Sequence, residues 1–106
     1  MGIENFLYPE KIAVVGASRH EGKTGHEIFD NLLHGFDGEV VPVNPNADKV
    51  EGVEASDKVP ENVDLAVVSV PAKFVPDVIR GCGEKDVDSA IVISAGFSES
   101  GNEALQ

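Results

Sequence analysis

Four short apolar runs along the chain predict β-strands that are buried on both faces. They cover residues 11–16, 39–43, 63–70 and 89–94. Each run is rich in β-branched residues and lacks the alternation of apolar and polar positions that marks a strand with one solvated face. Runs of this kind are typical of a parallel sheet, in which helices cover both faces.

Helical patterns occupy two of the three connections between these strands. The first helix is predicted to begin near Thr24, because Thr24 and Glu27 have the spacing of a capping box, and to end at Gly35. The second helix is predicted over residues 72–83. Its apolar residues share one helical face: Phe74, Val75, Val78, Ile79 and Cys82.

The connection over residues 44–62 is irregular, and one helical turn is expected at residues 56–59. Strands that alternate with helices form βαβ units with right-handed crossovers. The sequence therefore predicts an α/β fold with a Rossmann-like, doubly wound parallel sheet. A loop and the start of another helix follow Ser94, so residues 1–106 are expected to be a single domain truncated at its C-terminus, an N-terminal piece of a larger protein.

Composition and charge exclude several classes of function. The chain has 106 residues, of which 42% are apolar, enough for one globular domain with an ordinary core. Its 19 acidic and 8 basic residues give a net charge of −11, which argues against partners such as nucleic acid or an anionic membrane. No run is long enough to span a membrane, no secretion signal opens the chain, and the single cysteine, Cys82, has no disulfide partner. We therefore expect a cytoplasmic protein.

The acidic residues are spread evenly from Glu4 to Glu103 rather than gathered in one tail. A uniformly acidic surface that is poor in lysine is expected in a high-salt cytoplasm, such as that of a halophilic archaeon, where screening relieves the repulsion between like charges. Adaptation to salt is therefore one hypothesis for this composition.

Ligands of open α/β sheets bind beyond the carboxyl ends of the strands. The segments at these ends are residues 16–25, 43–48, 70–73 and 94–101. In the first segment, Gly16 allows a tight turn, and the small residues after it let the backbone approach a ligand. The start of the following helix, with Arg19 and Lys23 beside it, favours a phosphate group. An ordinary loop with solvated charges is the alternative.

Two familiar nucleotide-binding motifs do not fit this first segment. The G-x-G-x-x-G fingerprint fails because Ser18 stands at its second glycine, and no acidic residue follows the second strand to bind a ribose. NAD is therefore disfavoured. The sequence Gly22-Lys23-Thr24 resembles the end of a P-loop, but Ala17 stands where that motif requires its first glycine.

Half of the basic residues lie in the loops at the predicted strand ends, namely Arg19, Lys23, Lys49 and Lys73. This bias favours an anionic ligand. Three histidines lie in or near the first predicted helix, namely His20, His26 and His34. Their spacing is not that of metal ligands, so they are expected on a helix surface. No set of nucleophile, base and orienting residue is found, and the sequence predicts a binding module without catalytic residues or a metal site.

Taken together and in order, four stretches of the chain resemble one known family, the CoA-binding domain of ADP-forming acyl-CoA (acetyl-CoA) synthetases. The stretches are KIAVVGASRHEGKTG, NLLHGFDGEVVPVNPNA, VDLAVVSVPAKFVPDVI and AIVISAGFSESG. These synthetases belong to the superfamily of the succinyl-CoA synthetase α subunit. The resemblance covers residues 7–101 and implies a Rossmann-like domain that holds coenzyme A at the carboxyl edge of its sheet.

The resemblance also implies which residues bind the cofactor. They are Gly16, Ala17, Ser18, Arg19, Lys23, Gly25, Val43, Asn44, Pro45, Val70, Pro71, Ala72, Ser94, Ala95 and Gly96. The loop after the first strand would face the CoA phosphates, and residues 43–45 would border the nucleotide portion. Residues 70–72 would lie along the crevice, and residues 94–96 nearer the pantetheine.

The family catalyses acyl-CoA + ADP + phosphate ⇌ carboxylate + CoA + ATP, with Mg²⁺ and a phosphohistidine that lies in a following domain. The motif around that histidine and the ATP-grasp domain do not occur here, so the resemblance implies a domain that is inactive alone. Its implied partners are a CoA ester and the remaining domains or subunit of the synthetase. Three alternatives stay open: a free-standing CoA-binding or regulatory module, the N-terminal region of a protein acetyltransferase, and an NAD-binding oxidoreductase domain.

Overall fold

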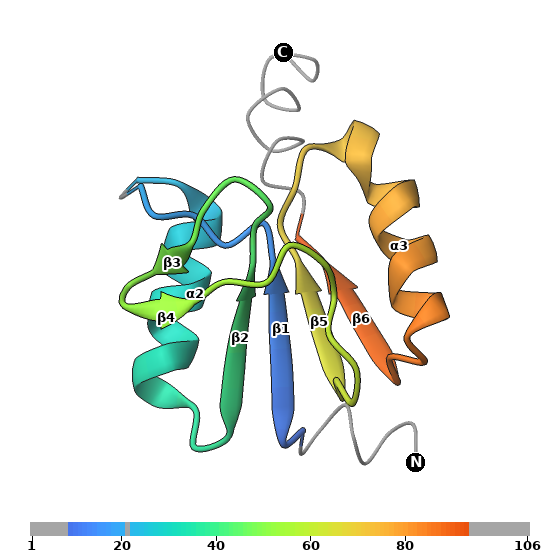
Figure 1. Ribbon diagram of the computed structural model, residues 1–106, viewed down its shortest axis with the longest axis horizontal. Coiled ribbons are helices and arrows are strands. Elements are labelled where there is room, and N and C mark those ends of the chain that lie inside the picture. The colour runs from blue at the N-terminus through green and yellow to red at the C-terminus, as the bar shows by residue number, and fades with distance from the viewer. Residues whose placement is uncertain (1–8, 21, 94–106) are drawn as a thin grey trace.

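The computed structural model describes residues 9–20 and 22–93 of the chain (Figure 1). Its centre is a sheet of four parallel strands: β1 (Lys11–Val15), β2 (Glu39–Val43), β5 (Leu65–Val68) and β6 (Ser89–Val92). The strands lie in the order β2-β1-β5-β6, and every neighbouring pair is parallel. The predicted α/β class and the Rossmann-like parallel sheet are therefore confirmed.

One helix covers each face of the sheet. The two helices are α2 (Thr24–Gly35) and α3 (Val75–Glu84). Successive residues of a strand point to opposite faces, and in β1 the buried Val14 packs in one core cluster with Phe29 of α2. Its neighbour Val15 packs in a second cluster with Cys82 of α3. These two apolar layers make the sheet doubly wound.

β6 is the exception to the prediction that all four strands are covered on both faces. Ile91 and Val92, which point to opposite faces, keep 36% and 42% of their surface exposed. β6 lies at the edge of the sheet, with no further strand beside it among the described residues. An apolar run does not reveal whether its strand is central or at an edge, and the prediction of full burial is wrong here.

The first helix has the predicted bounds but not the predicted cap. Lys23 is the N-cap residue, without a side-chain hydrogen bond, and Thr24 is already helical, so the capping box is wrong. The start of the helix instead makes a close backbone contact, since a Cβ atom on Gly25 would collide with the carbonyl oxygen of Gly16. At the other end, the helix stops at Gly35 as predicted.

The second predicted helix begins as a 3₁₀ turn, η1 (Ala72–Phe74), and continues as α3. Val78 and Cys82 pack on the sheet, whereas Phe74 and Ile79 are 48% and 40% exposed. The predicted single apolar face is therefore wrong for these two residues. Phe74 lies in the 3₁₀ turn that precedes α3.

A short antiparallel hairpin occupies the second connection. It consists of β3 (Lys49–Val50) and β4 (Val53–Glu54). Glu51 and Gly52 between these strands have φ values of 52° and 80°, the left-handed values of a tight hairpin turn. The predicted helical turn after the hairpin does not form, because Ser56 pairs with the end of β2: its N–H donates to Pro42, and its carbonyl accepts from the N–H of Asn44.

Candidate functional site

The strand order creates a switch point between β1 and β5, the position where ligands bind in doubly wound sheets. The chain leaves β1 toward β2 on one side and later returns to β5 on the other side. The loops that follow β1 and β5 meet there, since a Cβ atom on Gly16 would collide with the carbonyl group of Ser69 and lie 3.0 Å from Val70. Gly16 also has a φ of 93°, so this position requires glycine.

The start of α2 lies against this turn. Gly25 is buried and packs on the backbone of Gly16, which brings the first helical turn to the carboxyl end of β1. The N–H groups of Thr24 and Gly25 have no backbone acceptor within the described ranges, and the N-cap residue Lys23 offers no side-chain acceptor. Free N–H groups and the helix dipole make this end of α2 favourable for an anion.

Side chains from two other elements hold the loop between β1 and α2. Asn44, at the end of β2, donates from Nδ2 to the carbonyl oxygen of Ala17 at 2.8 Å. His26 of α2 places Nδ1 2.9 Å from the carbonyl oxygen of Ser18. The Ser18 hydroxyl accepts the N–H of His20 at 3.0 Å. These contacts hold the backbone of Ala17 and Ser18 between β2 and α2.

A cavity of about 570 Å³ opens beside the switch point, on the face covered by α3. The ends of β1 and β2, residues 57–59 and α3 contribute to its lining. The predicted site residues that line it are Gly16, Val43, Asn44, Pro45, Val70 and Pro71. Phe74, Val78 and Gly81 form the wall on the side of α3, at the i, i+4 and i+7 spacing of one helical side.

The other predicted site residues lie around this cavity rather than in its lining. Those within the described ranges are Ala17, Ser18, Arg19, Lys23, Gly25 and Ala72. Ala17 is fully buried in the core, so only its backbone is available to a ligand. Arg19 and Lys23 are exposed in the loop before α2, and Ala72 is exposed in η1. Ser94, Ala95 and Gly96 lie outside the described residues.

The main cavity carries charges of both signs. Its charged lining residues are Asp57, Lys58, Asp77, Glu84 and Lys85. The excess of carboxylates disfavours a phosphate group and suits an uncharged one. No signal in the sequence marked these five residues, because none of them follows a strand of the parallel sheet.

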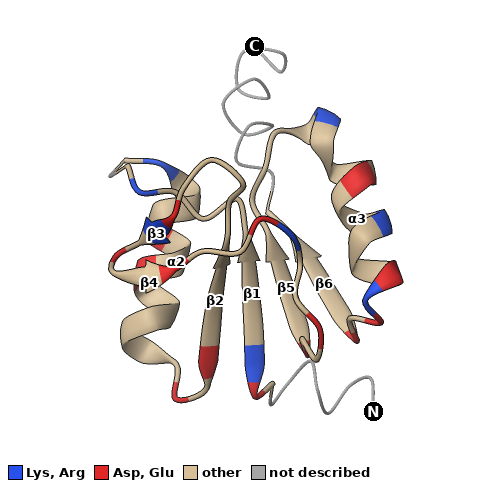
Figure 2. Cartoon of the chain, in the orientation of Figure 1, with Lys and Arg blue, Asp and Glu red and all other residues tan. Residues whose placement is uncertain are grey.

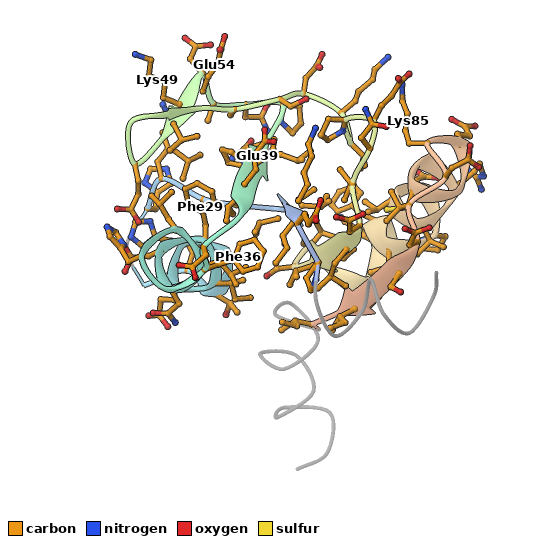
Figure 3. The ribbon with its side chains drawn as sticks, turned by 90° about the horizontal axis from the view of Figure 1, so that it is seen from below. Phe29, Phe36, Glu39, Lys49, Glu54 and Lys85 are labelled. Atoms are coloured by element: carbon orange, nitrogen blue, oxygen red, sulfur yellow. The ribbon has the colours of Figure 1, made fainter. Side chains whose placement is uncertain are left out.

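The basic residues expected at the strand ends do not line this cavity. Figure 2 shows basic positions in the loop before α2 and at the start of α3, near the end of the molecule where the strands terminate. Lys73 lies over the ring of Phe74, 5.2 Å from its centroid. Lys49 of β3 pairs with Glu54 of β4, and both side chains point outward from the hairpin in Figure 3. Both residues line a second cavity of about 400 Å³. Of these four basic residues, only Arg19 and Lys23 lie in the loop beside the start of α2.

His26 does not lie on a helix surface as expected. Its side chain is only 15% exposed, because the ring sits between Ser18 and Glu51, with Nε2 3.7 Å from the Glu51 carboxylate. His34, in contrast, is 68% exposed at the other end of α2, as predicted. The spacing of the histidines carried no signal for this difference. The one signal that could have revealed the contact is the position of His26 in the first helical turn after a glycine-rich loop.

The surroundings of three titratable groups shift their pKa values. A hydrogen bond to Asp30, helped by desolvation and by the charge of Asp30, raises the pKa of Glu51. The pKa of His34 is raised by its hydrogen bond to the Asp30 backbone carbonyl and by the Asp30 carboxylate. Burial raises the pKa of the Cys82 thiol, which keeps this core cysteine protonated.

Within the described part of the chain, no group of three His, Cys, Asp or Glu residues could hold a metal ion. No helix in this part is long and apolar enough to cross a membrane.

Comparison with known proteins connects this geometry to a family. Residues 10–106 match the family of CoA binding domains. The ADP-forming acetate–CoA ligase I of Archaeoglobus fulgidus is 49% identical over 98% of this chain and 16% of the ligase. The α subunit of the ADP-forming acetate–CoA ligase II of Pyrococcus furiosus is 44% identical over 95% of this chain and 23% of the subunit. The chain thus spans less than a quarter of either relative.

Solved structures share the fold. The apo form of the dinucleotide-forming acetyl-coenzyme A synthetase 1 of Ca. Korarchaeum cryptofilum superposes with a TM-score of 0.83 and 48% identity, covering 97% of this chain and 23% of that chain. A conserved hypothetical protein of Pyrococcus furiosus has a TM-score of 0.75 and 34% identity, covering 91% of this chain and 84% of its own. The chain therefore belongs to the family of CoA-binding domains, and it matches part of the longer ADP-forming acetate–CoA ligases.

Proposed function

We propose that this domain binds coenzyme A at the carboxyl edge of its sheet, as the CoA-binding part of an ADP-forming acyl-CoA synthetase. The observation that carries the proposal is the contact made by Gly16, which joins the uncapped start of α2 to the rim of a cavity of about 570 Å³. Coenzyme A combines charged phosphates with an uncharged base and a long pantetheine arm. This edge of the sheet offers a surface for each, and family membership supports the same ligand.

We assign the phosphates to the loop between β1 and α2. The N–H groups at the start of α2, which have no backbone acceptor among the described residues, create positive potential there together with the exposed side chains of Arg19 and Lys23. The main cavity has three carboxylates and two ammonium groups in its lining, so it suits the uncharged base better than a phosphate. Residues 43–45 would border this base, residues 70–72 would lie along the crevice, and residues 94–96 would be nearer the pantetheine arm.

In the parent enzyme, we propose the reaction acyl-CoA + ADP + phosphate ⇌ carboxylate + CoA + ATP. This domain would present CoA, while further domains or a second subunit would bind Mg²⁺ and ADP or ATP and carry the phosphorylated histidine. The greater length of the relatives supports this division of labour. Alone, the domain is expected to bind CoA and its acyl esters without converting them.

A free-standing CoA-binding module is the second candidate. It is favoured by the hypothetical protein of Pyrococcus furiosus, because this chain covers 84% of that protein. The length of the natural reading frame separates the two candidates. Further domains beyond residue 106 would exclude the free-standing module, and their type would separate a ligase from an acetyltransferase.

Isothermal titration calorimetry of the chain with CoA and with NAD tests the proposal. We expect one CoA site per chain and no heat from NAD, because Asn44 and Pro45 follow β2 where an acidic ribose ligand would stand. Binding of NAD without binding of CoA would overturn the proposal in favour of an oxidoreductase domain.

A further inference from the structure

We propose that His26 is a positioning residue of the phosphate site: with Asn44, it orients two successive peptide groups so that the N–H groups of Ser18 and Arg19 face the bound anion. The proposal rests on the proposed function, since it takes the CoA phosphates as that anion. It gives a role to a histidine that the spacing of the three histidines predicted on a helix surface.

The two carbonyl groups before these N–H groups are held from different elements. Asn44 Nδ2 donates to the Ala17 carbonyl oxygen at 2.8 Å, and His26 Nδ1 lies 2.9 Å from the Ser18 carbonyl oxygen. A carbonyl oxygen only accepts hydrogen bonds, so Nδ1 of His26 must carry the hydrogen. With the His26 side chain only 15% exposed, water competes little for this contact.

Because a peptide group is planar, the direction of each carbonyl bond fixes the direction of the following N–H bond. In a trans peptide, the C=O and N–H bonds point in opposite directions, and the described chain has no cis peptide bond. The N–H of Ser18 is therefore directed away from Asn44, and the N–H of Arg19 away from His26. Neither N–H has an acceptor within residues 9–20 and 22–93. Successive unpaired N–H groups beside a helix start form a concave site for an anion.

The hairpin holds the imidazole ring from its other side. His26 Nε2 lies 3.7 Å from Glu51 Oε2, and the Glu51 side chain is 23% exposed. Glu51 occupies the tight turn between β3 and β4, where its φ of 52° restricts the backbone. The ring therefore lies between the hairpin and the loop, and its Nδ1 contact keeps the Ser18 carbonyl from turning toward the ligand.

Amide NMR spectra of the unmodified chain give the first test. When CoA is added, the amide resonances of Ser18 and Arg19 are expected to shift, because a phosphate accepts their hydrogen bonds. If CoA binds and neither resonance moves, the inference is overturned while the proposed function stands. If CoA does not bind at all, the proposed function fails as well.

Two replacements at His26 provide the second test. His26→Phe keeps the ring but removes the donor, and is expected to weaken CoA binding by about tenfold, the value of one hydrogen bond near a charged ligand. His26→Asn places an amide donor at the position of Nδ1 and should restore most of the affinity. His34→Phe, at an exposed site of the same helix, is the matched control and should bind CoA normally.

A merely structural role for His26 predicts a different pattern. In that case His26→Phe would lower the melting temperature, yet the remaining folded protein would bind CoA with unchanged affinity and unchanged shifts at Ser18 and Arg19. That result would overturn the inference. If His26→Phe does not fold, the NMR titration of the unmodified chain decides the question by itself.

Discussion

Gly16 and Ser69 approach so closely at the ends of β1 and β5 that a Cβ atom on Gly16 would overlap the carbonyl group of Ser69. The contact is reinforced by the N–H of Ser69, which donates to the Val15 carbonyl at 2.8 Å. It holds together the two loops that diverge at the switch point. Because the start of α2 also packs on Gly16, this one residue relates the helix end to the cavity.

Gly16→Ala is expected to lower the free energy of unfolding by about 3 kcal/mol or more. The strain of a left-handed φ and the collision of the new Cβ atom with backbone both destabilise the folded state. Gly22→Ala is the matched control, since Gly22 has a φ of 90° but no atom within 4 Å of the Cβ position. It should cost about 1 kcal/mol, from the backbone conformation alone. Urea denaturation measures both values, and equal losses would contradict the role given to the Ser69 contact.

Gly81→Leu should weaken CoA binding by about tenfold or more without destabilising the fold, because a leucine at this position projects into the proposed base cavity. Gly83→Leu is the control, since Gly83 lies in the same helix with open space around it and does not line the cavity. Both replacements raise helix propensity, by up to about 1 kcal/mol. Calorimetry checks the pair, and equal CoA affinities would mean that the cavity does not receive the ligand.

Lys23→Ala is expected to weaken CoA binding severalfold at low ionic strength, because Lys23 is the N-cap residue at the start of α2, whose helix dipole also favours an anion. The loss should shrink as salt is added, since Lys23 is exposed and its charge is screened. Lys49→Ala serves as the control, because Lys49 lies opposite Glu54 in the hairpin. Unchanged affinity of Lys23→Ala at low salt would remove Lys23 from the site.

Glu51→Gln should stabilise the domain, and increasingly so as the pH rises. The hydrogen bond to Asp30 and the charge of Asp30 raise the pKa of Glu51 above its usual 4.5. A raised pKa means that the folded state binds the Glu51 proton more tightly. The stabilisation from this proton is complete below pH 4.5 and is lost as the pH rises through the higher pKa of the folded state. Melting temperatures of both proteins from pH 3 to pH 8 measure the difference, and a difference that shrinks with rising pH would contradict this reasoning.

The melting temperature is expected to rise between low and multimolar KCl if the net charge of −11 reflects adaptation to salt. Screening would then relieve repulsion among the evenly spread acidic residues. Equal concentrations of NaCl and KCl separate general screening from an effect of one cation. A flat or falling melting temperature would count against the salt hypothesis.

The sequence by itself determined the elements whose formation is decided within a short stretch. β2 forms at residues 39–43 because a β-branched run of that length suits a buried strand, and α2 ends at Gly35, a residue of low helix propensity. The placement of the candidate site also followed from sequence, since parallel strands bring their carboxyl ends to one edge. Six of the predicted site residues line one cavity for this reason.

Only the tertiary structure decided the contacts between elements that are distant in the chain. β3 and β4 have two residues each, too few for any pattern, and they pair through the turn at Glu51 and Gly52 while Val50 is fully buried. Lys58 and Lys85 reach the cavity from segments without a strand-end signal. His26 contacts the Ser18 carbonyl because the start of α2 packs against the turn after β1. Hydrophobic periodicity reports burial within one element, whereas the chemistry of a site depends on how separate elements pack against one another.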